Sequence, residues 1–318
     1  MGRDLSESVV VITGASSGIG RATALAFADA GASVVLAARR EQPLREAAGE
    51  CEARGVRALA VPADVRDAPA MQRLADRAAE AFGGIDVWVN NAGVTLMGRF
   101  EDAPPDLWRE VVEVNLMGYV NGARAALPHL RRRGAGALIQ VGSVNSRVGA
   151  PYASAYVASK FAVRGFAECL RAELRGDSIA VCTVMPASID TPLFQHAATF
   201  AGRAVKPLRP VLRPERVANA IVRCARRPRR EVVVGLSGRQ LILMHDLALP
   251  LFERVMSRTV EREHFLQRPA PPSAGNVREP MADWTGVTGG WKHGDASPQG
   301  APAPSATTPG TAAASGQA

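Results

Sequence analysis

The sequence predicts an α/β fold in which one doubly wound, mainly parallel sheet carries helices on both faces. Along residues 8–234, short apolar runs alternate with longer segments of helical periodicity. Most of the apolar runs lack alternation of polar and apolar positions, which is typical of strands buried on both faces. Regular strand–helix alternation indicates βαβ units, and such units build a parallel sheet.

The predicted elements follow one another in a regular order. We expect strands at 8–13, 33–38, 57–61, 85–89, 136–142, 178–184 and 230–234. We expect helices at 18–30, 42–54, 68–82, 106–132, 154–176 and 214–227. Gly31 and Gly134 stand where two of these helices should end, and Pro214 suits the first turn of the last one.

Composition narrows the class of protein. Apolar residues make up 47% of the 318 residues, which is enough for a sizeable core. The net charge of +8 comes largely from arginine runs at predicted helix ends, and these are not interleaved with aromatic residues as in a nucleic-acid binder. The four cysteines show no metal or disulfide spacing. We therefore predict no metal site and a reducing, cytoplasmic location.

No apolar run reaches the roughly 20 residues that a transmembrane helix needs. No signal peptide is visible, because the first strand begins near the first residue. Both observations agree with a cytoplasmic protein.

The alternation stops after residue 236. Residues 237–268 are predicted to be a helical extension, with one amphipathic helix at 239–258 that Pro250 should kink or split. Its apolar stripe is Leu241, Met244, Leu247, Leu251 and Val255. The helix should pack on the domain or on a partner subunit. A membrane-surface helix, flanked by Arg254, Arg258 and Arg262, is the alternative.

Residues 269–318 are rich in Pro, Ala, Gly, Ser and Thr and have no periodicity. Such a segment cannot bury enough apolar surface to offset the entropy of ordering it, so we expect a disordered tail. Trp284 and Trp291 are unusual in a tail of this kind.

A glycine-rich loop joins the first predicted strand to the first helix. It runs Thr13-Gly14-Ala15-Ser16-Ser17-Gly18-Ile19-Gly20. Glycines allow a tight turn and a close approach of the backbone to a pyrophosphate, and the following helix N-terminus attracts negative charge. The sequence therefore predicts a dinucleotide site at this loop.

A second group of residues suggests acid–base chemistry. Tyr156 and Lys160 lie one helical turn apart and share a face. A nearby ammonium should lower the pKa of the phenol, so that its oxygen can give and take a proton. Ser143 follows the fifth predicted strand, at the sheet edge where ligands bind in open α/β folds, and its hydroxyl can hold a carbonyl oxygen.

These motifs together resemble those of the short-chain dehydrogenase/reductases. The spacing of the glycines, Asn90-Asn91-Ala92-Gly93, Tyr156-x-x-x-Lys160 and Ser143 thirteen residues before Tyr156 carry the resemblance, over about residues 5–235. It implies a seven-stranded Rossmann-type sheet, a nicotinamide cofactor and catalysis by Tyr156, Lys160 and Ser143. It also implies that Asn115 kinks its helix and holds a water in a proton relay.

The resemblance implies further contacts with the cofactor. These involve Gly14, Ser16, Ser17, Gly18, Ile19, Gly20, Asp64, Val65, Asn91, Ala92, Gly93, Tyr156, Lys160, Pro186 and Thr191. Ala187 stands where the family usually has glycine, and its methyl group restricts the backbone angles of that loop. Residues 191–213 should form the substrate lid, with Phe194, Phe200 and Pro207 as an apolar pocket wall.

The end of the second predicted strand selects the cofactor. An NAD enzyme places an acidic residue there for the ribose 2′-hydroxyl, and this chain has Ala38. Arg39 follows, and a guanidinium suits a 2′-phosphate. We predict NADP as the cofactor, with NAD as the alternative.

The predicted protein is an NADP(H)-dependent oxidoreductase that transfers hydride to or from an apolar carbonyl compound or secondary alcohol. Residues 1–236 form the catalytic domain. The alternatives are a non-catalytic NADP-binding regulatory protein and a membrane-surface reductase of a lipid-like substrate. By analogy with the family we expect a homodimer or homotetramer that packs through the helices at 106–132 and 154–176, and no nucleic-acid partner.

Overall fold

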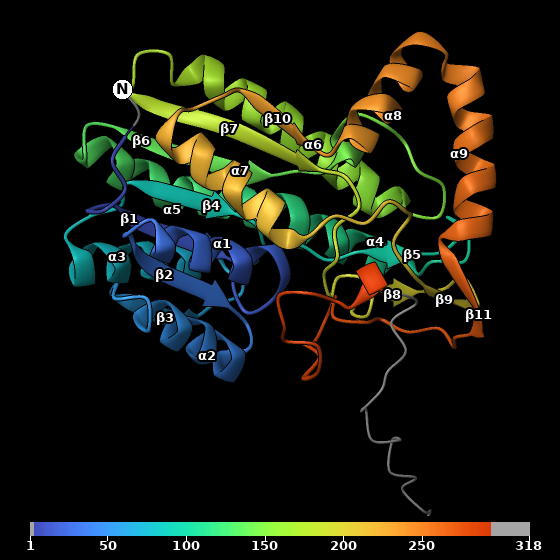
Figure 1. Ribbon diagram of the computed structural model, residues 1–318, viewed down its shortest axis with the longest axis horizontal. Coiled ribbons are helices and arrows are strands. Elements are labelled where there is room, and N and C mark those ends of the chain that lie inside the picture. Colours follow the sequence, from blue (N-terminus) through green and yellow to red (C-terminus); the bar gives the residue numbers. More distant parts are fainter. Residues whose placement is uncertain (1–2, 294–318) are drawn as a thin grey trace, which may run out of the picture.

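The computed structural model describes residues 3–293, and a seven-stranded parallel sheet forms the centre of that part (Figure 1). The strands lie in the order β10-β7-β6-β4-β1-β2-β3. Their bounds are β1 Val9–Thr13, β2 Ser33–Ala38, β3 Ala58–Pro62, β4 Val87–Asn90, β6 Gly136–Val141, β7 Ile179–Pro186 and β10 Glu231–Val234. All neighbouring pairs are parallel. The predicted fold class is confirmed.

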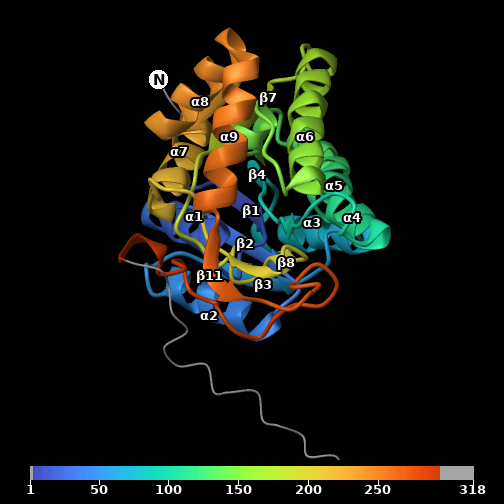
Figure 2. The same cartoon turned by 90° about the vertical axis from the view of Figure 1, so that its right-hand side faces the viewer.

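Helices cover both faces of the sheet, as Figure 2 shows from the side. On one face lie α1 Gly18–Asp29, α2 Glu41–Glu52 and α7 Pro214–Arg226. On the other lie α3 Ala68–Phe82, α4 Pro105–Val112, α5 Gly118–Arg132 and α6 Ser154–Glu173. Each helix buries an apolar stripe against strands that are themselves buried on both sides. The sheet is thereby shielded from water except at its edges.

The direction of winding reverses at β1. This strand pairs with β2 on one side and with β4 on the other, so the loops that follow β1 and β4 leave the sheet in different directions. A crevice opens between such loops at the carboxyl ends of the strands, and it is the usual place for a ligand in this class of fold. The candidate site lies there.

Two predicted helices are divided in the structure. The segment 106–132 consists of α4, a π-helical turn Glu113–Met117 and α5. The segment 239–258 belongs to α8 Leu236–Leu247 and α9 Leu249–Glu263, and Pro250 lies in the first turn of α9. Because proline fits a first helical turn but not a helix interior, the chain breaks at Ala248, as the sequence predicts for this proline.

Short elements that the sequence did not predict lie beside the carboxyl edge of the sheet (Figure 1). Strand β5 Leu96–Met97 pairs with β8 Ala198–Thr199, and β9 Arg203–Val205 pairs with β11 Phe265–Pro269. A 3₁₀ turn covers Val144–Ser146, and another covers Trp291–His293. Strands this short give no periodicity for a sequence pattern to detect.

The C-terminal segment differs from the expected disordered tail. Residues 270–293 follow the body of the protein, with Val277 fully buried and Trp291 4% exposed. Ser273 and Thr199 exchange two backbone hydrogen bonds of 2.9 Å. The segment is held by groups of the folded domain, which its own composition does not reveal. The remainder of the predicted tail, 294–318, lies outside the described residues.

Within residues 3–293 we find no helix with the length and apolar character needed to cross a membrane.

Candidate active site

The glycine-rich loop after β1 requires glycine at two positions for different reasons. Gly14 has φ +66°, which L side chains rarely adopt. At Gly20, an added Cβ would lie 2.1 Å from the carbonyl oxygen of Gly14. The loop therefore folds back on the first turn of α1, and the helix N-terminus faces the crevice. This is the arrangement that the sequence predicts for a pyrophosphate site.

The loops after β1 and β4 are tied together by two polar side chains. Thr13 Oγ1 accepts hydrogen bonds from the N–H groups of Asn91 and Ala92, at 3.0 and 3.2 Å. Asn91 Nδ2 donates to the carbonyl oxygens of Thr13 and Gly14, at 2.9 and 3.2 Å. Thr13 was not assigned a role from the sequence, although its place at the end of a buried strand was a usable signal. The side chain of Asn91 holds the two loops together at the floor of the crevice.

A cavity of about 200 Å³ occupies the crevice. It is lined by every residue predicted to contact the cofactor except Gly20 and Pro186. Gly20 supports the loop from beneath, and Pro186, the last residue of β7, lines a second cavity. The structure thus brings together residues from both ends of the family pattern, from the glycine loop to Tyr156 and Lys160. Glycines and basic side chains together in this lining are the kinds of residue that bind the phosphates of a dinucleotide.

Two arginines lie where the second strand ends. Arg39 donates to the carbonyl oxygens of residues 276–278, which belong to the C-terminal segment. Arg40, to which the sequence analysis assigned no role, donates to the hydroxyl oxygens of Ser16 and Ser17 at 3.2 and 3.0 Å. Both guanidinium groups therefore lie beside the cavity. The end of β2 carries no carboxylate, since Ala38 is its last residue.

Asp64 also lines the cavity, but its carboxylate is paired. Arg66 donates to it through its side chain at 2.6 Å and through its backbone N–H at 2.9 Å. Burial opposes ionisation, yet these contacts with Arg66 keep the pKa of Asp64 below its usual value. Asp64 is therefore an acceptor at neutral pH, and its neighbour Val65 adds an apolar side to the same wall.

Lys160 is buried among oxygen atoms near Tyr156. Its Nζ donates to the carbonyl oxygen of Val141 at 2.9 Å and to the hydroxyl of Tyr119 at 3.3 Å. It lies 5.7 Å from the centre of the Tyr156 ring. Tyr119, which the sequence analysis missed, follows Asn115 by four residues and so lies on the same helical side. That spacing was the signal that could have identified it.

The electrostatics of the pair differ from the sequence-based expectation. Burial raises the pKa of Tyr156, and a hydrogen bond with Ser143 only partly opposes this shift. Burial also lowers the pKa of Lys160 to about 7. The lysine is then not fully charged near neutrality and exerts less pull on the phenol than a free ammonium would. Tyr156 is thus protonated in the structure at neutral pH.

Ser143 is fixed by the short turn that it begins. Its Oγ accepts a hydrogen bond from the N–H of Asn145 at 3.1 Å, and its N–H donates to Ser146 Oγ at 3.2 Å. These two contacts cap the turn and hold the hydroxyl of Ser143 next to Tyr156. Ser146, the weaker candidate from the sequence, is fully buried beneath it.

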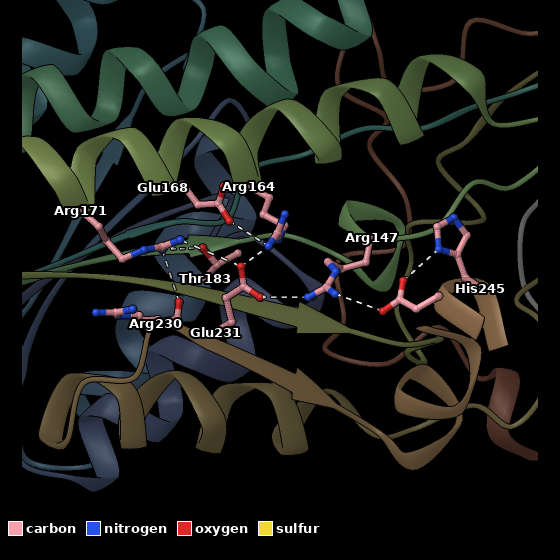
Figure 3. Close-up of polar contacts among 9 residues, drawn as sticks. Arg147, Arg164, Glu168, Arg171, Thr183, Arg230, Glu231 and His245 are labelled. Atoms are coloured by element: carbon pink, nitrogen blue, oxygen red, sulfur yellow. Dashed lines mark hydrogen bonds and ion pairs between the residues drawn. The ribbon is translucent and has the colours of Figure 1, made fainter. Parts of the chain in front are cut away.

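An ion-pair network anchors the far end of this turn (Figure 3). Arg147 contacts Glu231 on β10 at 3.4 Å and Asp246 on α8 at 3.3 Å. Glu231 also accepts from Arg164 on α6 at 2.8 Å. Networks of this kind fix geometry better than isolated surface pairs. The turn that carries Ser143 is therefore linked to the sheet edge, to α6 and to the helical extension.

Asn115 lies in the π-helical turn and is fully buried. Its Oδ1 accepts from the N–H of Val94 at 2.8 Å, and its Nδ2 donates to Val94 O and Ser159 Oγ at 2.9 and 3.0 Å. The helix is distorted here, as the family resemblance implies. The amide joins the loop after β4 to α6, next to Lys160. A relay role for Asn115 stays a prediction.

Ala187 is accommodated by two glycines, Gly235 and Gly238. An added Cβ on Gly235 or Gly238 would lie 3.2 or 3.4 Å from the methyl group of Ala187. The methyl group therefore uses space that side chains at those positions would otherwise fill. Thr191, further along the same loop, lines both cavities.

A second cavity of about 390 Å³ adjoins the first, and Tyr156, Gly142 and Thr191 line both. Ser143 lies in its wall. Part of its apolar lining comes from the predicted lid, as Leu193, Phe194 and Leu208, and part from α8 and α9, as Leu241, Met244, Val255, Met256 and Val260. Phe200 and Pro207, which we expected in this wall, are not part of it, because Phe200 packs on the central core. The helical extension instead closes the cavity.

The comparisons with known proteins agree with this geometry. A family model described as short chain dehydrogenase matches residues 8–201. The chain is 36% identical over 274 residues to the uncharacterized oxidoreductase YxnA of Bacillus subtilis, covering 85% of this chain and 77% of that protein. It is 34% identical over 267 residues to dehydrogenase/reductase SDR family member 7B of Bos taurus, covering 80% of this chain and 82% of that protein.

A solved structure of similar fold is a short chain dehydrogenase from Mycobacterium paratuberculosis bound to NAD. Its TM-score is 0.67 at 27% identity, and the match covers 75% of this chain and all of that one.

The glycine loop generates a test with a matched control. We expect Gly20→Ala to lower the free energy of unfolding by about 1–3 kcal/mol and to weaken binding of a nicotinamide cofactor, because the added methyl forces the loop apart. Gly49→Ala on α2 places its methyl in open space and should leave binding unchanged. Urea unfolding and cofactor fluorescence titration measure both effects. Normal cofactor affinity in Gly20→Ala would contradict the assigned role of the loop.

Proposed function

The chain belongs to the short-chain dehydrogenase/reductase family of oxidoreductases, and we propose that it is an NADP(H)-dependent reductase or dehydrogenase of apolar carbonyl compounds and alcohols. The observation that supports this most directly is that Tyr156 lies at the boundary between the two cavities. A group at that boundary can reach both a cofactor in the first cavity and a substrate in the second. A bound nicotinamide would supply or accept the hydride.

In this proposal, the substrate oxygen lies between Tyr156 and Ser143. The hydroxyl of Tyr156 gives its proton to the oxygen during reduction and takes it back during oxidation. The raised pKa of Tyr156 keeps the phenol in the protonated form that reduction needs. Ser143, held by its turn, donates a second hydrogen bond to the same oxygen as negative charge develops.

Lys160 acts on Tyr156 rather than on the substrate. It lies beneath the phenol ring and is held by Val141 and Tyr119. Burial lowers the pKa of Lys160 to about 7, so its charge, 5.7 Å from the centre of the Tyr156 ring, depends on pH near neutrality. Asn115 and Ser159 position the helix that carries both residues.

The choice of NADP(H) rests on the basic end of β2. Arg39 and Arg40 lie beside the cavity, and Ala38 leaves no carboxylate to pair with a 2′-hydroxyl. NAD is the alternative cofactor for this chain, because a related structure is bound to NAD. The substrate is proposed to be apolar because aliphatic and aromatic side chains form most of the second cavity.

A non-catalytic regulatory protein is the less favoured alternative. Such a protein would need the first cavity but not Ser143 and Tyr156 together at the second one.

A membrane-surface reductase is the other alternative, and one observation favours it. Leu243, Leu247, Leu249 and Leu251 are exposed near the junction of α8 and α9, and Val255 is both exposed and part of the second cavity. A lipid-like substrate could pass from a bilayer into the cavity along this side. If this alternative holds, the protein floats with phosphatidylcholine vesicles, and the double variant Leu247→Gln, Leu251→Gln remains in the dense fraction. Flotation of both proteins to the same extent argues against this alternative, and so does flotation of neither.

Tyr156→Phe tests the catalytic assignment. Loss of the proton donor should lower kcat for carbonyl reduction by about 10²–10⁴-fold while NADPH binding is retained. Tyr152→Phe is the matched control, since Tyr152 packs against Phe265 at 5.1 Å between ring centres and has no lysine four residues later. Steady-state kinetics on a panel of apolar ketones gives the comparison. Equal loss in both variants would point to a structural effect instead.

Arg39→Asp tests the cofactor assignment. The change removes a phosphate ligand and introduces a carboxylate that can accept from a 2′-hydroxyl, so affinity for NADPH should fall and affinity for NADH should rise. Titration of nicotinamide fluorescence with both cofactors measures the preference. Equal binding of NADPH and NADH by the native chain would remove the NADP assignment and leave the enzyme assignment in place.

A further inference from the structure

Residues 270–293, here called the strap, cross the mouth of the first cavity. Figures 1 and 2 show the strap passing from β11 below the sheet toward the loop after β7. Its residues Asn276, Pro280 and Met281 line the cavity. The strap therefore forms part of the wall of the proposed cofactor site, although it lies outside residues 8–201 that match the family.

Both ends of the strap are firmly held. Near its start, Ser273 pairs with Thr199, and Val277 is fully buried in the central core. Near its end, the buried carboxylate of Asp190 accepts from the N–H groups of residues 289, 291 and 292, at 3.0, 2.9 and 3.3 Å. The indole of Trp291 donates to Thr191 O at 3.2 Å. Of these anchors only Val277 contacts an arginine at the end of β2, since its carbonyl oxygen accepts from Arg39 at 3.3 Å.

The middle of the strap binds the groups that the proposed function assigns to phosphate. Arg39 donates to the carbonyl oxygens of Asn276 and Arg278 at 2.5 and 2.8 Å, and Arg40 donates to those of Met281 and Asp283 at 3.0 Å each. At the N-terminus of α1, the N–H of Gly18 donates to Gly286 O at 3.0 Å. Main-chain carbonyls thus satisfy a set of donors that otherwise suits an anion.

The hydrogen bonds of Arg39 and Arg40 to main-chain carbonyls are weaker than hydrogen bonds of the same groups to a phosphate. In a hydrogen bond from a guanidinium to a carbonyl oxygen only the donor is charged, whereas a phosphate adds a charged acceptor and can accept two parallel hydrogen bonds from one guanidinium. The ion pairs of Arg278 with Asp106 and Glu110 on α4 are exposed to solvent and add little. Two further hydrogen bonds of 3.0 Å join Arg21 to Thr285 O and His196 Nε2 to Asp283 O. A 2′-phosphate can therefore compete with the strap carbonyls for Arg39 and Arg40, whereas a 2′-hydroxyl has no charge with which to do so.

We propose that the strap is a gate selective for the phosphorylated cofactor: in the free protein, main-chain carbonyls of residues 278–286 accept from Arg40 and, at Arg278, from Arg39, and the 2′-phosphate of NADP(H) releases these contacts. The anchors at Val277 and Asp190 keep the movement local. NAD(H) leaves the gate closed. This inference rests on the proposed use of NADP(H).

The first test follows the gate itself. Trp284 lies in the part of the strap that is released, and its fluorescence is isolated by comparison with Trp284→Phe. Acrylamide quenching of Trp284 should increase in saturating NADP⁺ and stay unchanged in saturating NAD⁺. Adenosine 2′,5′-bisphosphate should reproduce the effect of NADP⁺, and ADP should not.

The second test loosens the strap without touching the cavity. Arg278→Ala removes the ion pairs to α4 and should tighten binding of adenosine 2′,5′-bisphosphate by about 1.5–5-fold, the range expected for exposed ion pairs. Binding of ADP should not change. Arg268→Ala, an exposed arginine on β11 ahead of the strap, is the matched control and should change neither affinity. Calorimetric titration measures all of these constants.

The outcomes distinguish failure of the proposed gate from failure of the proposed preference for NADP(H). If the native protein prefers NADP⁺ but Trp284 quenching does not respond to it, the gate is wrong and the cofactor assignment stands. Weaker binding of the bisphosphate by Arg278→Ala would likewise overturn the gate, since the strap would then be a clamp on the bound nucleotide. A native protein with no preference for NADP⁺ over NAD⁺ overturns both.

Discussion

The close approach of two main chains at the carboxyl edge of the sheet is the constraint on which the rest of the site depends. The loops after β1 and β4 touch because β1 and β4 are neighbours although they are distant in sequence. Glycine at positions 14 and 20 permits the contact, and Thr13 and Asn91 hold it. This leaves a crevice with a helix N-terminus on one side and Tyr156 on the other. The positions of the cofactor and catalytic residues follow from that geometry.

The periodicity of the chain predicted the fold almost completely. The seven sheet strands lie within a few residues of their predicted bounds, because buried parallel strands and amphipathic helices have distinct patterns that tertiary contacts reinforce. The site residues with spaced motifs, such as Tyr156 and Lys160, also came together as predicted. Residues that act through long-range contacts were missed, as with Tyr119 and Arg40, since their partners lie far away in sequence.

The physical state of the site residues was less predictable than their positions. The four-residue spacing in the sequence predicted that Lys160 lies near Tyr156. The pKa shifts of both groups, however, depend on how deeply the fold buries them. The C-terminal segment shows the same limit more strongly. Its composition is that of a disordered chain, and its order comes from arginines, a buried aspartate and a core that belong to other parts of the protein. Composition predicts whether a segment is ordered by its own contacts, but not whether contacts with the rest of the protein order it.

The anchoring of Trp291 by Asp190 affects how the protein can be shortened in the laboratory. A low-complexity C-terminus is often trimmed before crystallisation, and composition alone would place the cut near Pro269. Such a cut would remove three N–H donors from a carboxylate that is only 3% exposed. Loss of these hydrogen bonds costs stability, so the cut should disturb the loop after β7, which lines both cavities. A cut beyond residue 293 keeps these contacts intact.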